Sequence, residues 1–226
     1  MRAVLIIPAL NEEDSIGRVL DEIPPGLFAE VIVSDNGSAD RTAEVAAQHG
    51  ARVVQESRRG YGNACLRAMA NLPAGTEIVA FMDADGSDVP GEARSLLEPI
   101  ASGQADLVLG SRVLGASEAG SLTPHQRCGN ALATWLIHLL HGHRYTDLGP
   151  FRAIRAASLV ELGMNDPNYG WTAEMQIRAP RKGLRVVEIP VSYRRRRQGK
   201  SKVSGNVLGS VKAGVKILWT VGRLTF

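Results

Sequence analysis

The stretch Ile78-Val79-Ala80-Phe81-Met82-Asp83-Ala84-Asp85-Gly86 decides the fold of this chain. Five apolar residues run directly into two carboxylates that stand one residue apart. Such an apolar run predicts a parallel strand that is covered on both faces. The carboxylates then lie at the carboxyl end of the strand, where open α/β sheets bind their ligands. The pair is typical either of a solvated loop or of a site for Mg²⁺ or Mn²⁺, which prefer hard oxygen ligands.

Strand and helix patterns alternate around this stretch. We expect strands at residues 4–7, 30–34, 52–54, 78–82, 107–109 and 186–189. We expect helices up to residue 22 and at residues 41–48, 60–72, 92–102, 126–141, 157–162 and 172–182. This alternation predicts a Rossmann-like, doubly wound, mostly parallel α/β sheet with right-handed crossovers. Residues 147–153 show no regular pattern, and we expect them to be irregular.

Length and composition fit one compact domain with an appendage. The chain has 226 residues, 44% of them hydrophobic, which is enough for one sizeable core. We place the main domain at residues 1–202 and a C-terminal helical extension at 203–226. Cys65 and Cys128 match no metal spacing, and we expect reduced core cysteines of a cytoplasmic protein. No apolar run approaches the ~18 residues of a membrane span.

Basic residues concentrate at the C-terminal end. Residues 181–226 hold 12 Lys or Arg and one acid, whereas the other 180 residues hold 14 basic and 22 acidic groups. A basic tail on an acidic body predicts an anionic partner. Residues 203–226 have an amphipathic helical pattern, whose apolar stripe comprises Val207, Leu208, Val211, Val215, Leu218 and Val221 or Gly222. Such a helix suits an anionic membrane surface, the protein's own core or a second subunit.

Four loops follow expected strands and share one edge of the expected sheet. They comprise residues 8–13, 35–40, 83–87 and 110–112. A nucleotide crevice at such an edge needs small residues for close backbone approach, acids for ribose and base contacts, and a place for a diphosphate. Asp35 either accepts a hydrogen bond from the ribose or base, or closes its own turn.

The ordered motifs of these loops resemble glycosyltransferase family 2, whose members are inverting enzymes with the GT-A fold. The motifs are IPALNEE at residues 7–13, DNGSADRT at 35–42, DADG at 83–86 and GSR at 110–112. Three later segments are similar to the dolichyl- or polyprenyl-phosphate mannosyl- or glucosyltransferase branch. They are DLGPFRAI at 147–154, YGWTAEM at 169–175 and GKSK at 199–202.

The resemblance implies a nucleotide-diphospho-sugar donor, UDP- or GDP-hexose, across the sheet edge. The residues implied in donor binding are Pro8, Leu10, Asn11, Glu12, Asp35, Gly37, Arg59 and Asp83. Asp83 and Asp85 would hold Mg²⁺ or Mn²⁺ with the diphosphate, and a cation there would neutralise charge on the departing nucleoside diphosphate. Many relatives carry Gln as a further ligand where this chain has Ser87.

For the acceptor, the resemblance implies a polyprenyl phosphate bound by Arg112 and Arg127. The basic segment adds Arg194 and Lys202. The planar fork of arginine pairs well with phosphate oxygens. A phosphate acceptor is already anionic, so positioning by these arginines would supply most of the catalysis.

A hydroxyl acceptor would instead require a carboxylate base. Glu174 is the best candidate for that catalytic role by resemblance, and Asp147 is second. Two functions therefore stay open beside transfer to a lipid phosphate. One is transfer to the hydroxyl of a lipid or small molecule, and the other is a non-catalytic membrane- or nucleic-acid-binding protein that uses residues 194–202.

We disfavour nucleic acid as a partner, because the basic segment has no interleaved stacking aromatics beyond Tyr193. The favoured prediction is a metal-dependent inverting hexosyltransferase. We expect it at the cytoplasmic face of the membrane, peripherally attached through the C-terminal helix. The sequence leaves its oligomeric state open.

Overall fold

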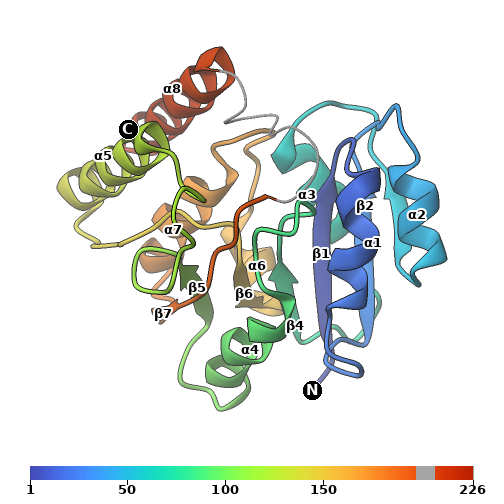
Figure 1. Ribbon diagram of the computed structural model, residues 1–226. Coiled ribbons are helices and arrows are strands. Elements are labelled where there is room, and N and C mark those ends of the chain that lie inside the picture. The colour runs from blue at the N-terminus through green and yellow to red at the C-terminus, as the bar shows by residue number, and fades with distance from the viewer. Residues whose placement is uncertain (197–206, 226) are drawn as a thin grey trace.

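The computed structural model describes residues 1–196 and 207–225, with the backbone alone for residues 207–213. Within these residues, seven strands form one sheet in the order β3-β2-β1-β4-β6-β5-β7 (Figure 1). The strands are β1 (Ala3–Ala9), β2 (Glu30–Asp35), β3 (Arg52–Gln55), β4 (Ile78–Phe81), β5 (Leu107–Ser111), β6 (Arg152–Arg155) and β7 (Val186–Pro190). The mostly parallel α/β sheet is thereby confirmed.

The strand β6 departs from the sequence prediction. It runs antiparallel between β4 and β5, whereas the other neighbouring strands are parallel. The prediction of irregular structure at residues 147–153 was wrong from Arg152 onward. Only four residues long and flanked by arginines, this buried strand shows neither a long apolar run nor a clear alternation. Its central residues Ala153 and Ile154 are fully buried.

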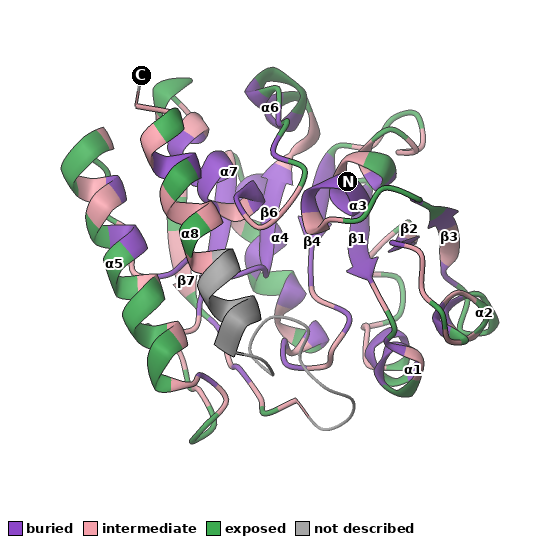
Figure 2. Ribbon diagram, turned by 90° about the horizontal axis from the view of Figure 1, so that it is seen from above, coloured by how far each residue is buried: buried purple, intermediate pink, exposed green. Residues whose placement is uncertain are grey.

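Helices cover both faces of the sheet, as a doubly wound fold requires (Figures 1 and 2). The helices α1 (Glu13–Asp21), α2 (Thr42–Gln48) and α4 (Ala93–Ala101) pack on one face. The helices α3 (Tyr61–Met69), α6 (Ala156–Leu162) and α7 (Trp171–Arg181) pack on the other. Alternate residues of β1 enter the two cores, since successive side chains of a strand point to opposite faces.

Two further helices form a layer outside α7. They are α5 (Pro124–His141) and α8 (Val207–Arg223), which lie side by side in both ribbon views. Thr123 and Gln126 form a capping box at the start of α5, with Pro124 in its first turn. The two helices share a small core with α7, formed by Ala133, Ile137, Leu148, Ala173, Ile177 and Val221.

Only part of the predicted apolar stripe of α8 faces the protein's core. Val221 is fully buried and Ile217 packs on the same core, whereas Val215 is 61% exposed. The side chains of Val207, Leu208 and Val211 and the boundary at residues 202–203 lie outside the described residues. Cys65 is buried as expected, but the prediction for Cys128 was wrong, because α5 turns that residue to solvent.

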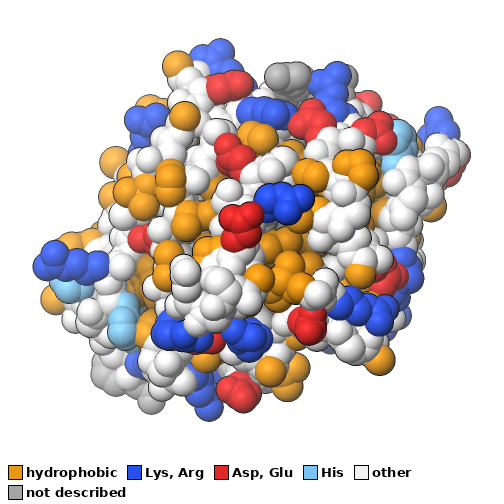
Figure 3. Space-filling view, turned by 90° about the horizontal axis from the view of Figure 1, so that it is seen from below, with side chains coloured by type: hydrophobic (Ala, Val, Ile, Leu, Met, Phe, Trp, Pro, Cys, Tyr) orange, Lys and Arg blue, Asp and Glu red, His pale blue; other side chains and the backbone are white. Residues whose placement is uncertain are grey.

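The strand directions bring the predicted loops to one edge. All strands except β6 run the same way, so their carboxyl ends meet at the top of Figure 1. The loops after β1, β2, β4 and β5 therefore surround one region, as the sequence predicts. The opposite edge of the sheet carries basic, acidic and hydrophobic side chains intermixed (Figure 3).

Candidate active site

The acidic pair lies in the loop that follows β4. The carboxylate oxygens Oδ1 of Asp83 and Oδ1 of Asp88 are buried, and neither has a hydrogen-bond partner among the described residues. Asp88 accepts a hydrogen bond from the backbone N–H of Asp83 at 3.2 Å. Burial, together with the charge of Asp85, raises the pKa of Asp83 to about 7. The loop therefore concentrates negative charge that a cation would stabilise.

The geometry of this loop fits a cation that brings ligands of its own. Asp85 is the outer member of the pair, with a side chain 20% exposed. Nowhere in residues 1–196 and 207–225 do three His, Cys, Asp or Glu side chains gather as a metal site. Ser87 is buried and holds the loop by donating its N–H to Asp85 at 2.9 Å. Mg²⁺ is commonly bound by one or two carboxylates and completed by substrate phosphates, and this arrangement fits that pattern.

The loop after β1 is tied to the loop after β2. Asn11 has a φ of 50°, and its Oδ1 accepts a hydrogen bond from the N–H of Ala39 at 2.7 Å. The N–H of Asn11 donates to Ser38 Oγ at 2.9 Å. The N–H of Glu12 donates to Thr42 Oγ1 at 2.7 Å. These bonds bring the predicted donor residues of both loops together.

Asp35 closes its own turn, which is one of the two interpretations that the sequence allows. Its carboxylate is buried and accepts hydrogen bonds from the N–H of Ser38 at 3.2 Å and from the Ser38 hydroxyl. Gly37 in this turn has a φ of +76°, a conformation that glycine adopts without strain. Arg59 donates to the carbonyl of Asn36 at 3.0 Å and so covers the turn. Donor contacts by Asp35, Gly37 and Arg59 stay predictions, as do those by Pro8 and Leu10.

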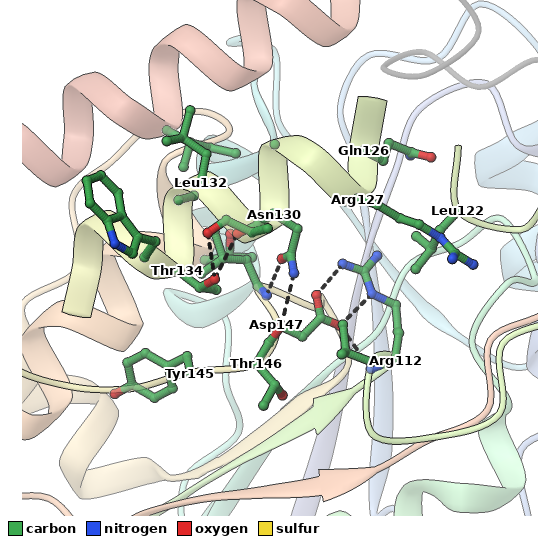
Figure 4. Close-up of a pocket in the computed structure, with 18 of the residues that line it drawn as sticks. Arg112, Leu122, Gln126, Arg127, Asn130, Leu132, Thr134, Tyr145, Thr146 and Asp147 are labelled. Atoms are coloured by element: carbon green, nitrogen blue, oxygen red, sulfur yellow. Dashed lines mark hydrogen bonds and ion pairs between the residues drawn. The ribbon is translucent and has the colours of Figure 1, made fainter. Parts of the chain in front are cut away.

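A pocket of about 1170 Å³ lies between α5, α8 and the loops after β5 and before β6 (Figure 4). Arg112 and Arg127 lie at one end, and Leu132 lies farther along α5. The apolar lining includes Leu122 beside Arg127 and, along α5 and α8, Leu132, Trp135, Val215, Ile217 and Leu218. The pocket therefore joins a cationic end to an apolar wall.

Arg112 is held rigidly at the cationic end. Its Nε and Nη2 donate to the two carboxylate oxygens of Asp147, each at 2.7 Å. The ring of Tyr193 lies 5.0 Å from the guanidinium carbon. Asp147 is 2% exposed and engaged on both oxygens, so this geometry does not support its suggested role as a base. Asp147 positions Arg112 instead.

Arg127 has a different environment on the first turns of α5. It lines the same pocket but is exposed. Within the described residues, its guanidinium makes no ion pair or hydrogen bond that would neutralise it. Asn130, one turn further on, bonds to the backbone of Thr146 at 3.0 Å and of Leu148 at 2.9 Å. Those bonds fix α5 over the pocket, so the free charge of Arg127 is held at its mouth.

Glu174 does not face the pocket. Its side chain is fully buried, and Oε2 accepts hydrogen bonds from the N–H groups of Asn165 at 3.0 Å and Asp166 at 2.7 Å. Its Oε1 forms an ion pair with Arg178 at 2.8 Å. A base must reach the acceptor's proton, and this carboxylate is enclosed. The expectation of a catalytic Glu174 is therefore not carried forward, because the residue holds the loop before α7.

The basic segment after β7 lies beside the acidic loop. Arg194 pairs with Glu22 at 2.6 Å and donates its N–H to the carbonyl of Ser87 at 2.8 Å. It is not part of the pocket lining, so its predicted acceptor contact finds no support in this geometry. Lys202 lies outside the described residues. Sequence reasoning missed Arg196, which forms ion pairs with Glu12 and Asp85, because one arginine within a basic run carries no distinguishing signal.

Known proteins share this fold and these motifs. The family model described as glycosyl transferase family 2 matches residues 4–162. An uncharacterized glycosyltransferase of Mycobacterium tuberculosis is 43% identical over 210 residues, which cover 92% of this chain and 93% of that protein. Undecaprenyl-phosphate mannosyltransferase of Micrococcus luteus is 30% identical over 230 residues, covering 95% and 93%.

A solved structure gives the same result. Glucosyl-3-phosphoglycerate synthase of Mycobacterium tuberculosis, in complex with Mn²⁺, UDP-glucose and phosphoglyceric acid, matches with a TM-score of 0.80 and 25% identity. The match covers 99% of this chain and 79% of that one. The chain belongs to glycosyltransferase family 2 and is a glycosyltransferase.

Proposed function

We propose that the protein transfers a hexose, with inversion, from a UDP- or GDP-hexose to a polyprenyl phosphate. The observation that carries this proposal is the pocket of Arg112 and Arg127, with its apolar wall along α5 and α8. Its volume of about 1170 Å³ is above the usual ~300–1,000 Å³ of pockets for small ligands. A phosphate with a long apolar tail suits both ends of such a pocket.

The donor would occupy the acidic edge. Asp83 and Asp85 would hold Mg²⁺ or Mn²⁺ there, and the bound cation would neutralise charge on the departing diphosphate. A solved relative binds Mn²⁺ with UDP-glucose, which supports this choice of donor and metal. The loops after β1 and β2 would bind the nucleotide, and the hydrogen bonds between them would fix their positions.

A phosphate acceptor would need no catalytic base. A phosphate oxygen would form a bond to the anomeric carbon while the bond from that carbon to the donor diphosphate breaks. This oxygen is already anionic and needs no deprotonation. Asp147 and Glu174, the two candidate bases, are engaged in ion pairs instead. Arg112 and Arg127 would orient the phosphate, which is a positioning role.

A second acceptor class has one observation in its favour. The matching solved structure holds phosphoglyceric acid, a small acceptor that bears a phosphate. The cationic end of the pocket suits that phosphate equally well. The apolar wall has no role with so small and polar an acceptor, so we rank it second.

The surface around the pocket supports membrane contact. Large apolar side chains are exposed on α5 and α8, namely Leu132, Trp135, Leu139, Leu140, Val215 and Trp219. Lys216 and Arg223 lie over the Trp219 ring at 4.1 and 4.9 Å. Aromatic residues beside basic groups suit the interface of an anionic membrane. In the described part of the chain, none of the helices has the length and apolarity to cross a bilayer, so this contact would be peripheral.

The acceptor proposal is tested by kinetics with undecaprenyl phosphate in detergent. Arg127→Gln is expected to raise the KM for the lipid phosphate by about tenfold or more, as expected for one charge-assisted contact. Arg185→Gln is the control, because it changes an exposed arginine at the opposite edge of the sheet, directly before β7, that pairs with Asp106. Equal kinetics for Arg127→Gln and wild type would refute the phosphate role of Arg127.

Membrane contact is tested by flotation with anionic liposomes. We expect the full chain to float and the double variant Trp135→Ser, Trp219→Ser to lose most of its binding. Val160→Ser removes an apolar residue that is 76% exposed on α6, away from this surface, and should float like wild type. Flotation of the double variant at the wild-type level would contradict the assignment.

A further inference from the structure

Arg196 brings a positive charge to the acidic loop after β4. Its guanidinium forms ion pairs with Glu12 and, at 3.5 Å, with Asp85. The Arg196 side chain is 15% exposed, and those of Glu12 and Asp85 are 9% and 20% exposed. Two acids that the donor proposal uses therefore share one guanidinium.

The backbone places this arginine firmly. The segment after β7 donates N–H groups from Val191 to Ser111 at 3.1 Å and from Arg194 to Ser87 at 2.8 Å. Tyr193 forms bridges with both Asp88 and Ser117. These bonds attach the segment to the acidic loop on one side and to the loop after β5 on the other. Arg196 therefore reaches Asp85 because the fold brings it there.

We propose that Arg196 is a placeholder cation, which occupies Asp85 until a divalent metal arrives together with the donor diphosphate. A guanidinium and a metal ion cannot both contact the same carboxylate oxygen. A metal that binds without the donor must therefore break the ion pair between Arg196 and Asp85, and the displaced guanidinium gains no new anionic partner. A metal that arrives with a diphosphate supplies new anionic oxygens to its coordination shell and to the displaced guanidinium.

The consequence is joint binding of metal and donor. Free metal should bind weakly, because it competes with an ion pair that is largely sheltered from solvent. The same contact pairs Asp85 beside the buried Oδ1 of Asp83, which has no hydrogen-bond partner among the described residues. Because Tyr193 of this segment also stacks on Arg112, the segment that carries Arg196 contacts both the donor and the acceptor sides. This inference rests on Asp85 as a metal ligand.

The test measures Mn²⁺ binding without turnover, by the electron paramagnetic resonance signal of free Mn²⁺. Arg196→Gln keeps length and polarity but removes the charge. It should bind Mn²⁺ alone about tenfold more tightly than wild type, a change that corresponds to about 1.4 kcal/mol. Arg195→Gln is the matched control, because Arg195 belongs to the same segment but bonds to Glu118 and Ala119. This control should leave the Mn²⁺ affinity unchanged.

Adding UDP or GDP separates this inference from the proposed function. Wild type should bind Mn²⁺ far more tightly with the nucleotide than without it, and Arg196→Gln should show a smaller gain. If Mn²⁺ fails to bind wild type even with either nucleotide, the donor proposal fails and this inference fails with it. If the nucleotide complex forms but Arg196→Gln binds Mn²⁺ alone no better than wild type, the placeholder role is refuted by itself.

Discussion

Replacing Glu174 by Ala should destabilise the protein strongly. The change removes a fully buried carboxylate that accepts two backbone hydrogen bonds and pairs with Arg178. It leaves a partly buried guanidinium without its counter-ion and the N–H groups of Asn165 and Asp166 without their acceptor. Removing one member of a buried ion pair costs about 3–5 kcal/mol. For a chain of this size, that corresponds to a fall in Tm of roughly 6–20 °C.

The assay combines thermal unfolding with transfer kinetics at a temperature where the variant is folded. Glu174→Gln keeps an acceptor oxygen for the two N–H groups and removes only the charge, so its Tm should fall less than that of Glu174→Ala. Both folded variants should retain most of the wild-type kcat. The reasoning is refuted if Tm is unchanged while kcat falls by the ~10²–10⁴-fold that is typical of a lost general base.

Three further changes probe other parts of the account. Asp147→Asn should loosen Arg112. Steady-state kinetics should then show a higher KM for the lipid phosphate than in wild type and little change in the KM for the donor. A KM for the lipid phosphate equal to that of wild type would contradict this. Burial and the charge of Asp85 raise the pKa of Asp83 to about 7, so native Asp83 holds a proton that the unfolded chain releases near pH 4. In urea unfolding with a chelator, the free energy of unfolding of wild type should therefore fall, relative to that of Asp83→Asn, as the pH rises from about 4 to about 7. The same pH dependence of the free energy of unfolding in both proteins would contradict the raised pKa of Asp83. A Cβ at Gly62 would lie 1.9 Å from the carbonyl oxygen of Asp166. Gly62→Ala should therefore lower the free energy of unfolding by about 1–3 kcal/mol. An unchanged unfolding midpoint would contradict this close packing of α3 against Asp166.

The sheet and its functional edge could be predicted because their signals are local. A buried parallel strand is an unbroken apolar run, as at Ile78–Phe81, and strand direction alone brings the following loops together. The strand β6 could not be predicted, since four residues between β4 and β5 depend on neighbours that are distant in sequence. For the same reason, the sequence could not indicate which residues of the predicted stripe on α8 enter the core. Periodicity shows that Val215 and Val221 are both apolar, but only packing against α5 and α7 selects Val221 for the core.

The roles of charged residues were predicted less well, because a carboxylate takes its role from its partner. Sequence motifs singled out Glu174 and Asp147 as acids near a site. Their arginine partners, Arg178 and Arg112, are seen only in the structure, and these ion pairs favour structural or positioning roles for both acids. The contact of Arg196 with Asp85 spans 111 positions of the chain, and no spacing rule could have indicated it. The acidic loop itself could be predicted, because its position depends only on the local sequence, in which two acids directly follow the apolar strand β4.

The central claim is that the cationic end and apolar wall of one pocket select a lipid phosphate as acceptor. A competition assay tests it most directly, with labelled UDP- and GDP-hexoses, Mn²⁺, and equal concentrations of undecaprenyl phosphate, undecaprenol and 3-phosphoglycerate. The account predicts that the label enters undecaprenyl phosphate and that a chelator abolishes this transfer. Label that enters only 3-phosphoglycerate or undecaprenol would contradict the account.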